Sequence, residues 1–174
     1  VEDLRTFSHL DNVKHTQVKV SELINSTVHL VQTQYNSIEI ETQFDYSPLI
    51  TCIPSKLSQV FMNIIVNACQ SIEIRKQLEK DLKGIVSIKA AQDDNRLVLT
   101  FADNGCGMKE ETLHRIFEPF FTTKVVGTGT GLGMAISFGI IEEHGGSIEV
   151  ESAVDQGTKI IINLMNRVLN STNT

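Results

Sequence analysis

The chain has 174 residues and a formal net charge of −6; 41% of the residues are hydrophobic and 21% are charged. This composition is typical of a globular domain with one core, and it argues against a disordered chain, a membrane-spanning segment or a basic nucleic-acid surface. We therefore expect no nucleic-acid partner and no membrane contact by this chain. Its three cysteines have no metal-like spacing, which favours a reducing, cytoplasmic location, whether or not the parent protein is membrane-anchored.

The first predicted elements are two helices separated by a candidate domain boundary near residues 12–20. The first ends near residue 12, and the second begins with Ser21 as its N-cap. One face of the second helix is apolar and contains Leu23, Ile24, Val28 and Val31. Clean alternation of apolar and polar residues over 38–44 then predicts a strand, and a shorter strand follows over 49–53.

Pro54 predicts the start of a helix with a broad apolar stripe, made of Leu57, Val60, Phe61, Ile64, Ile65 and Ala68. Asn63 and Asn67 are four residues apart, so they lie on one edge of this helix. An amide oxygen can ligate Mg²⁺, but taken alone the two amides are better explained by hydrogen bonds to loops or contact with solvent. The polar run 73–83 either extends the helix or forms a solvated loop.

The second half of the chain alternates strands, turns and helices. It predicts strands over 85–91, 97–102, 147–151 and 158–164, one helical turn over 110–115, and a helix over 131–144 that ends at Gly145-Gly146. Together these elements predict an α+β fold, a two-layer sandwich in which a mixed, mostly antiparallel sheet is covered by helices on one face.

Two segments have the chemistry of a nucleotide site. Asp103-Asn104-Gly105-Cys106-Gly107-Met108 follows a strand, and its carboxylate can accept a hydrogen bond from an amine such as adenine N6, although Asp-Asn-Gly is also common turn chemistry. Gly127-Thr128-Gly129-Thr130-Gly131-Leu132-Gly133 places glycines at alternate positions before a helix, where N–H groups can converge on a phosphate. A flexible hinge is the alternative for this loop, which has neither the P-loop ending nor a surrounding βαβ unit.

In order and spacing, these segments resemble the ATP-binding catalytic domain of sensor histidine kinases, which have the Bergerat fold also found in DNA gyrase and the heat-shock chaperone ATPases. The asparagine helix matches the N box of that family, 103–107 its G1 box, 116–121 its F box, 127–133 its G2 box and 157–158 its last motif. The segment 67–71 looks like the nitrogen-regulation type. The resemblance implies the end of a dimerisation helix and a linker over 1–19, the ATP-binding domain over 20–166 and a frayed tail over 167–174.

The same resemblance implies ATP and Mg²⁺ as cofactors and a role for each motif residue. Asn67 would ligate Mg²⁺. Asn63 and Lys124 would act catalytically, Asn63 beside the phosphates and Lys124 by reaching one of them. Asp103 would bind adenine N6, and the other nucleotide-binding residues would be Gly105, Gly107, Met108, Gly127, Gly129, Thr130, Gly131, Leu132, Gly133 and Thr158. Many members carry a basic residue where this chain has Gln70, which leaves that phosphate contact open.

The resemblance favours a kinase over a hydrolase, because Asn63 stands where the true ATPases of the family carry a glutamate that activates water. A neutral amide does not take a proton from water, so the γ-phosphoryl group should go to a histidine. The chain would then be a protein-histidine kinase domain. Its partners would be a histidine-bearing dimerisation domain outside this chain and, through the parent, a response regulator.

Two alternatives stay open: an ATP-driven conformational ATPase or chaperone-type module, and a nucleotide-binding pseudokinase. His9 follows Phe7-Ser8, but Leu10 replaces the acid that would orient its ring. We therefore expect His9 to belong to the end of the second dimerisation helix and not to be the phosphoacceptor.

Overall fold

The computed structural model describes residues 15–124 and 129–165. In this part of the chain one sheet has five strands, in the order β2 (Glu39–Phe44), β4 (Ile85–Asp93), β5 (Arg96–Asp103), β7 (Gly157–Met165) and β6 (Ser147–Ala153). The β2–β4 pair is parallel, whereas β4–β5, β5–β7 and β6–β7 are antiparallel. The sheet is therefore mixed and mostly antiparallel, as expected.

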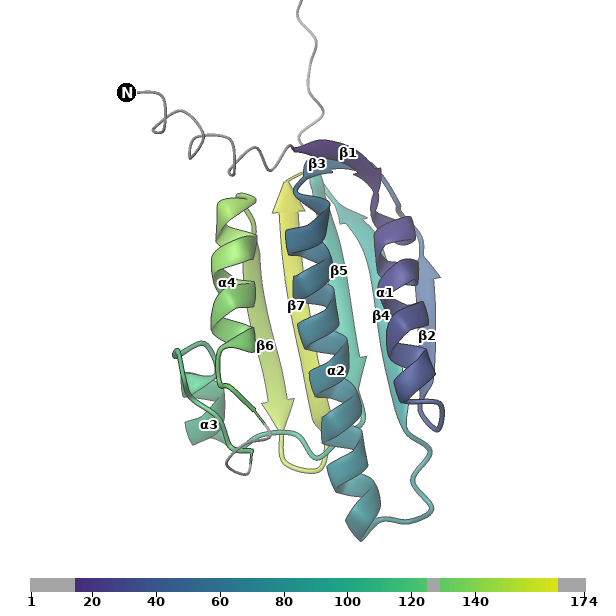
Figure 1. Ribbon diagram of the computed structural model, residues 1–174, viewed down its shortest axis with the longest axis vertical. Helices are drawn as coiled ribbons and strands as arrows, with labels where there is room; N and C mark the ends of the chain where they lie inside the picture. The colour runs from purple at the N-terminus through teal and green to yellow at the C-terminus, as the bar shows by residue number, and fades with distance from the viewer. Residues whose placement is uncertain (1–14, 125–128, 166–174) are drawn as a thin grey trace, which may run out of the picture.

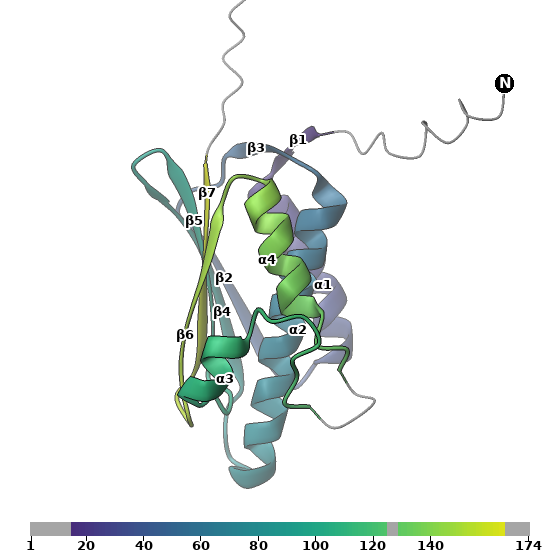
Figure 2. The same ribbon diagram turned by 90° about the vertical axis from the view of Figure 1, so that its left-hand side faces the viewer.

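Three longer helices cover one face of this sheet, as the edge-on view shows (Figures 1 and 2): α1 (Val20–Gln34), α2 (Pro54–Leu78) and α4 (Gly133–Glu143). The central helix is α2, which packs between α1 and α4. The short helix α3 (Glu110–Arg115) lies against β6. The predicted two-layer sandwich is confirmed.

The core lies between α2 and the sheet. All six predicted stripe positions of α2 are buried, and Phe61 packs on Phe101 of β5 with ring centroids 5.7 Å apart. Leu97 and Leu99 of the same strand are fully buried as well. Burial of each such side chain stabilises the fold by about 1.5–3 kcal/mol, so this packing holds α2 rigidly above the sheet.

The start of α1 differs from the prediction. The helix begins at Val20, with Lys19 in the N-cap position and no side-chain cap, so the prediction that Ser21 caps it is wrong. The reason is an unpredicted strand, β1 (Thr16–Lys19), which pairs antiparallel with β3 (Leu49–Cys52) and continues directly into the helix. Ser21 lies in the first turn, where its N–H donates to Ser47 Oγ at 3.1 Å.

Two other boundaries shift. The polar run after Ile72 extends α2 to Leu78, which resolves the choice between helix and loop in favour of the helix for 73–78. The last helix begins at Gly133 and not at Gly131, because Gly131 has a φ of +67°, outside the helical region. No helix of the described part is long and apolar enough to cross a membrane. The predicted helix end containing His9 and the tail over 167–174 lie outside the described residues.

Candidate functional site

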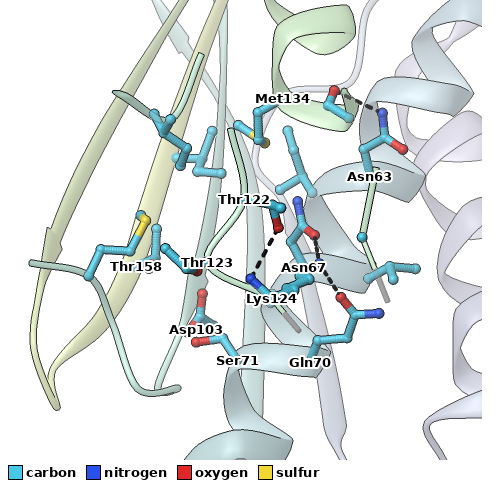
Figure 3. Close-up of a pocket in the computed structure, with 18 of the residues that line it drawn as sticks. Asn63, Asn67, Gln70, Ser71, Asp103, Thr122, Thr123, Lys124, Met134 and Thr158 are labelled. Carbon is cyan, nitrogen blue, oxygen red and sulfur yellow. Dashed lines mark hydrogen bonds between the residues drawn. The ribbon is translucent and has the colours of Figure 1, made fainter. Parts of the chain in front are cut away.

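A cavity of about 700 Å³ opens between the second half of α2, the ends of β5 and β7, and the segment from α3 to α4. Most of the predicted site residues line it: Asn63, Asn67, Asp103, Gly107, Met108, Lys124, Gly129, Thr130, Gly131, Gly133 and Thr158. Gly105 and Leu132 do not line it, and Gly127 lies outside the described residues. The fold thus brings four separate sequence segments to one cavity (Figure 3).

Asp103 ends β5 at one side of this cavity. Its Oδ1 accepts a hydrogen bond of 2.7 Å from the N–H of Gly105. Burial raises the pKa of this carboxyl to about 6, and the backbone N–H groups of Gly105 and Thr158 only partly oppose that rise. A half-buried carboxylate that accepts hydrogen bonds at a cavity wall is suited to bind a donor such as an amine.

Close backbone packing surrounds Asp103. A Cβ atom on Gly157, whose φ is +88°, would lie 1.9 Å from the carbonyl oxygen of Asp103. A Cβ atom on Gly105 would lie 2.2 Å from Ser71 Oγ, so Gly105 packs against α2 and does not face the cavity. Its contribution is the N–H that holds Asp103, which differs from the direct nucleotide contact that we expected.

The side-chain oxygens of Asn67 and Gln70 both contact the ammonium group of Lys124. Lys124 Nζ donates to Asn67 Oδ1 at 2.9 Å and also to Gln70 Oε1 (Figure 3). Burial lowers the pKa of the Lys124 ammonium. The amide oxygen expected to ligate Mg²⁺ therefore faces a positive charge, which fits a site for a hard cation.

Few side chains at this site could ligate Mg²⁺. The described residues contain no group of three His, Cys, Asp or Glu side chains able to hold a metal. A Mg²⁺ ion bound through one amide would rely on phosphate oxygens and water for its other ligands, as is common where the metal accompanies a nucleotide.

Asn63 connects two helices. Its Nδ2 donates to the carbonyl of Gly133 at 3.1 Å and to Ser137 Oγ at 3.3 Å, both in the first turns of α4. The side chain lines the cavity, but its amide nitrogen is engaged by the backbone that follows the glycine loop. The amide nitrogen therefore bonds the start of a helix, and not a loop or solvent as in the alternative given above.

The aromatic segment before the glycine loop fixes the base of that loop. Phe117 packs on Phe138 of α4 with centroids 5.2 Å apart, and the Arg115 guanidinium lies 4.3 Å from the centre of the Phe121 ring. Phe120 is 75% exposed and has a φ of +65°. Phe117 therefore anchors this segment on α4, and Phe121 packs against the end of α3.

Several residues that line the cavity were not predicted from the sequence. Ser71, Thr122, Thr123 and Met134 also line the cavity. The position of Ser71, four residues after Asn67, places it on the same helix edge and could have identified it. The threonines gave no such signal, because only the folded loop turns them inward (Figure 3).

Curated relatives of this chain include sensor proteins and kinases. The chain is 36% identical over 163 residues to a putative sensor protein of Shewanella frigidimarina (strain NCIMB 400), which covers 92% of this chain and 24% of the relative. It is 37% identical over 155 residues to sporulation kinase E of Bacillus subtilis (strain 168), which covers 87% of this chain and 20% of the relative. The chain thus spans about a quarter or less of the length of these relatives.

Solved structures, among them that of a sensor histidine kinase, have the same fold. The mycobacterial sensor histidine kinase MprB superposes with a TM-score of 0.75 at 27% identity, over 88% of this chain and 98% of that one. Full-length ShkA in complex with AMPPNP gives a TM-score of 0.73 at 26% identity, over 86% of this chain and 30% of that one. These similarities confirm the expected resemblance to histidine kinase catalytic domains.

The family match covers the cavity itself. Residues 52–167, about two thirds of the 174 residues, match the family described as "Histidine kinase-, DNA gyrase B-, and HSP90-like ATPase". This stretch contains α2, the turn after β5, the aromatic segment and the glycine loop. The chain belongs to the family of histidine kinase-, DNA gyrase B- and HSP90-like ATPases.

Proposed function

We propose that this chain is the ATP-binding catalytic domain of a sensor histidine kinase, which binds Mg-ATP in the cavity and donates the γ-phosphoryl group to a histidine outside the chain. The observation that supports this most directly is the polarity of the cavity. A half-buried carboxylate, Asp103, lies at one part of its wall, and a cation held by amide oxygens, Lys124, lies at another. Adenine N6 and the phosphates of one ATP molecule have the complementary chemistry.

At the adenine end, Asp103 accepts from N6, and Gly107, Met108 and Thr158 line the same region. A Cβ atom on Gly107 would lie 1.9 Å from the carbonyl oxygen of Ala153, so glycine lets this turn pack closely against the backbone at the end of β6. Selection of adenine over guanine follows, because guanine has a carbonyl oxygen where adenine has its N6 amine.

At the phosphate end, Asn67 holds Mg²⁺ and Lys124 contacts a phosphate. Bound Mg²⁺ neutralises phosphate charge and orients the transferred group. Gln70 has no positive charge, but it accepts from Lys124 Nζ, so the cation that other members carry at this helix position comes here from the loop. The departure at position 70 is therefore compatible with phosphate binding.

Transfer to a histidine fits this cavity better than hydrolysis does. Among the described residues that line it, Asp103 is the one carboxylate, and its position is that of the adenine ligand. Asn63 donates through its nitrogen to Gly133 and Ser137, and it has no basic group to activate water. The acceptor histidine would belong to the dimerisation domain of a cytoplasmic kinase module, with a response regulator as the next partner.

Titration calorimetry of the chain with ATP, with and without Mg²⁺, tests the proposal, together with a phosphate-release assay and a GTP control. We expect binding of ATP that Mg²⁺ strengthens, weaker binding of GTP, and very slow release of phosphate. Absence of ATP binding would contradict the nucleotide site. Steady turnover of ATP by the chain alone would favour the conformational ATPase instead.

A further inference from the structure

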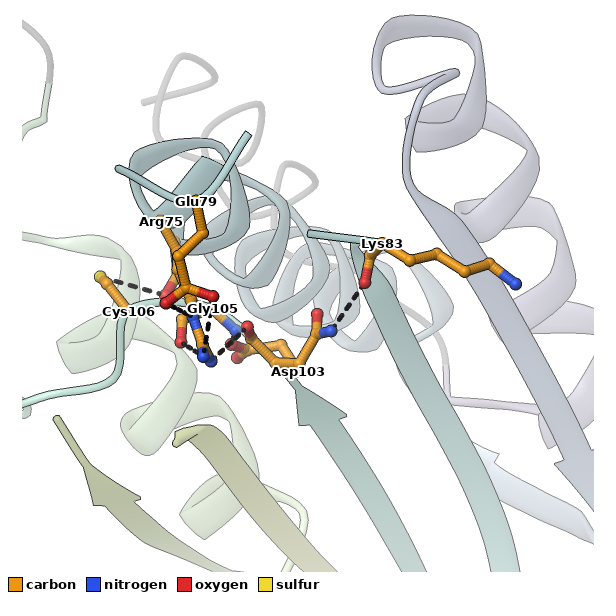
Figure 4. Close-up of polar contacts among 8 residues, drawn as sticks. Arg75, Glu79, Lys83, Asp103, Gly105 and Cys106 are labelled. Atoms are coloured by element: carbon orange, nitrogen blue, oxygen red, sulfur yellow. Dashed lines mark hydrogen bonds and ion pairs between the residues drawn. The ribbon is translucent and has the colours of Figure 1, made fainter. Parts of the chain in front are cut away.

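The C-terminal end of α2 projects beyond the sheet (Figure 1). It carries Arg75, a basic side chain that is largely covered by its neighbours (Figure 4). The Arg75 side chain is only 17% exposed. Its Nη1 donates to the carbonyl of Asn104 at 3.1 Å and to that of Gly105 at 3.4 Å. The polar extension of the helix thus contacts the turn that follows Asp103, a role that the family motifs do not assign to it.

Glu79, one helical turn later, fixes the direction of the guanidinium. Arg75 Nε donates to Glu79 Oε1 at 3.0 Å, and Nη2 donates to Oε2 at 3.3 Å. This two-point pairing uses the planar geometry of both groups and leaves Nη1 directed at the turn. The pair therefore works as an oriented donor and not only as a surface ion pair.

The Asn104 carbonyl links Arg75 to the hydrogen bond that holds Asp103. It belongs to the same peptide group as the Gly105 N–H, which donates to Asp103 Oδ1 at 2.7 Å. Because a peptide group is planar, a donor bound to its carbonyl fixes the direction of its N–H. A positive donor on the carbonyl also polarises the group and strengthens the hydrogen bond that its N–H makes.

Other contacts hold the neighbouring atoms of the turn. The Asn104 side chain accepts from Ile85 N at 2.8 Å and donates to the carbonyl of Lys83 at 2.8 Å, while Cys106 N donates to the carbonyl of Ser71 at 3.2 Å. These bonds fix both ends of the turn. The carbonyl of the Asn104–Gly105 peptide is the group that Arg75 holds.

We propose that Arg75 is a positioning residue for adenine recognition: held by Glu79, it fixes the Asn104–Gly105 peptide, which orients the Asp103 carboxylate toward the cavity. The inference rests on the proposed function, because it takes Asp103 as the acceptor for adenine N6. A purely structural role would make Arg75 matter for stability and for every nucleotide equally. A positioning role makes it matter most for nucleotides that carry the N6 amine.

Two probes separate these roles: ATP and purine riboside triphosphate, which lacks the 6-amino group. A hydrogen bond to a charged acceptor typically gives a preference of ~10–100-fold, so we expect the unaltered chain to prefer ATP by about that factor. Arg75→Met should reduce this preference at least ~5-fold and leave the affinity for purine riboside triphosphate within ~2-fold. Lys56→Met is the matched control, since it breaks the Lys56–Glu143 ion pair at the other end of α2 and should leave both affinities unchanged.

Glu79→Ala provides a second test of the positioning role, which does not depend on whether Arg75→Met folds. It keeps the guanidinium but removes its orienting partner, so the preference for ATP should fall at least ~2-fold. An unchanged preference in either folded variant, or an equal loss of both affinities, would overturn the positioning role. An unaltered chain that binds neither probe would overturn the proposed function itself, and one that binds both equally would remove Asp103 from adenine recognition.

Discussion

Replacing Asp103 with asparagine should affect stability and nucleotide binding in opposite directions. Burial raises the pKa of the Asp103 carboxyl from its ordinary value of 3.8 to about 6, which means that the folded protein without nucleotide holds the charged form at a cost. A raised pKa contributes stability that is fully present below 3.8 and is lost as the pH rises through about 6. The asparagine variant does not titrate, so it avoids this loss.

The rise from 3.8 to about 6 corresponds to about 3 kcal/mol of unfolding free energy, at 1.36 kcal/mol for each pKa unit. Asparagine keeps an oxygen that can accept from the Gly105 N–H, so the turn should survive the change. We therefore expect Asp103→Asn to be more stable than the unaltered protein by up to about 3 kcal/mol near pH 8 and equally stable below about pH 4. ATP binding should be lost, because the amide nitrogen brings a second donor to adenine N6.

Urea unfolding across this pH range, with an ATP titration at neutral pH, measures both effects. Asp81→Asn is the control, since Asp81 is an exposed loop carboxylate and its removal changes the net charge equally. A stability difference that is the same at every pH would show that burial of the Asp103 charge is not its source. A stabilised variant with unchanged ATP affinity would remove Asp103 from the adenine site.

Three further changes test the phosphate end of the cavity. Asn67→Ala should reduce the gain in ATP affinity that Mg²⁺ provides by at least ~10-fold and leave the metal-free affinity nearly unchanged, as measured by titration with and without the metal. Lys124→Met should lower the metal-free ATP affinity by ~10–100-fold, because it removes a charged donor; an unchanged affinity would show that Lys124 does not reach a phosphate. Gly131→Val places a Cβ atom 2.5 Å from the carbonyl carbon of Phe120 at a φ of +67°, so in single-turnover assays it should slow phosphotransfer more than it weakens ATP binding.

The fold was largely predictable because its apolar patterns are regular. Pro54 and the stripe that follows it predict the start and the buried face of α2, and both are confirmed. The alternation over 38–44 predicts β2 for the same reason. The strand β1 has no such pattern: Thr16–Lys19 is mostly exposed and exists through its pairing with β3, which is a long-range contact that local sequence does not encode.

The position of a site residue was predictable where a sequence motif determines the local backbone. It was less predictable where the residue is held by hydrogen bonds to distant parts of the chain. Asp103, Gly107, Gly129, Gly131 and Gly133 line one cavity, whereas Gly105 packs against α2. The partners of Asn63, and the meeting of Gln70 with Lys124, join residues 54 to 74 positions apart. The role of Arg75 could not be predicted, because a basic residue in a polar run is typical of a solvent-exposed helix face. Only the tertiary structure shows that its guanidinium is covered.

We propose that this chain binds ATP and passes its γ-phosphoryl group to a histidine on another domain. The most direct measurement incubates the chain with γ-labelled ATP and Mg²⁺, alone and with the histidine-bearing dimerisation domain of the same parent. We expect no label on the chain alone, His9 included, and acid-labile, base-stable label on the added domain. Stoichiometric labelling of His9 in the isolated chain, or steady release of phosphate with no labelled histidine, would contradict this proposal.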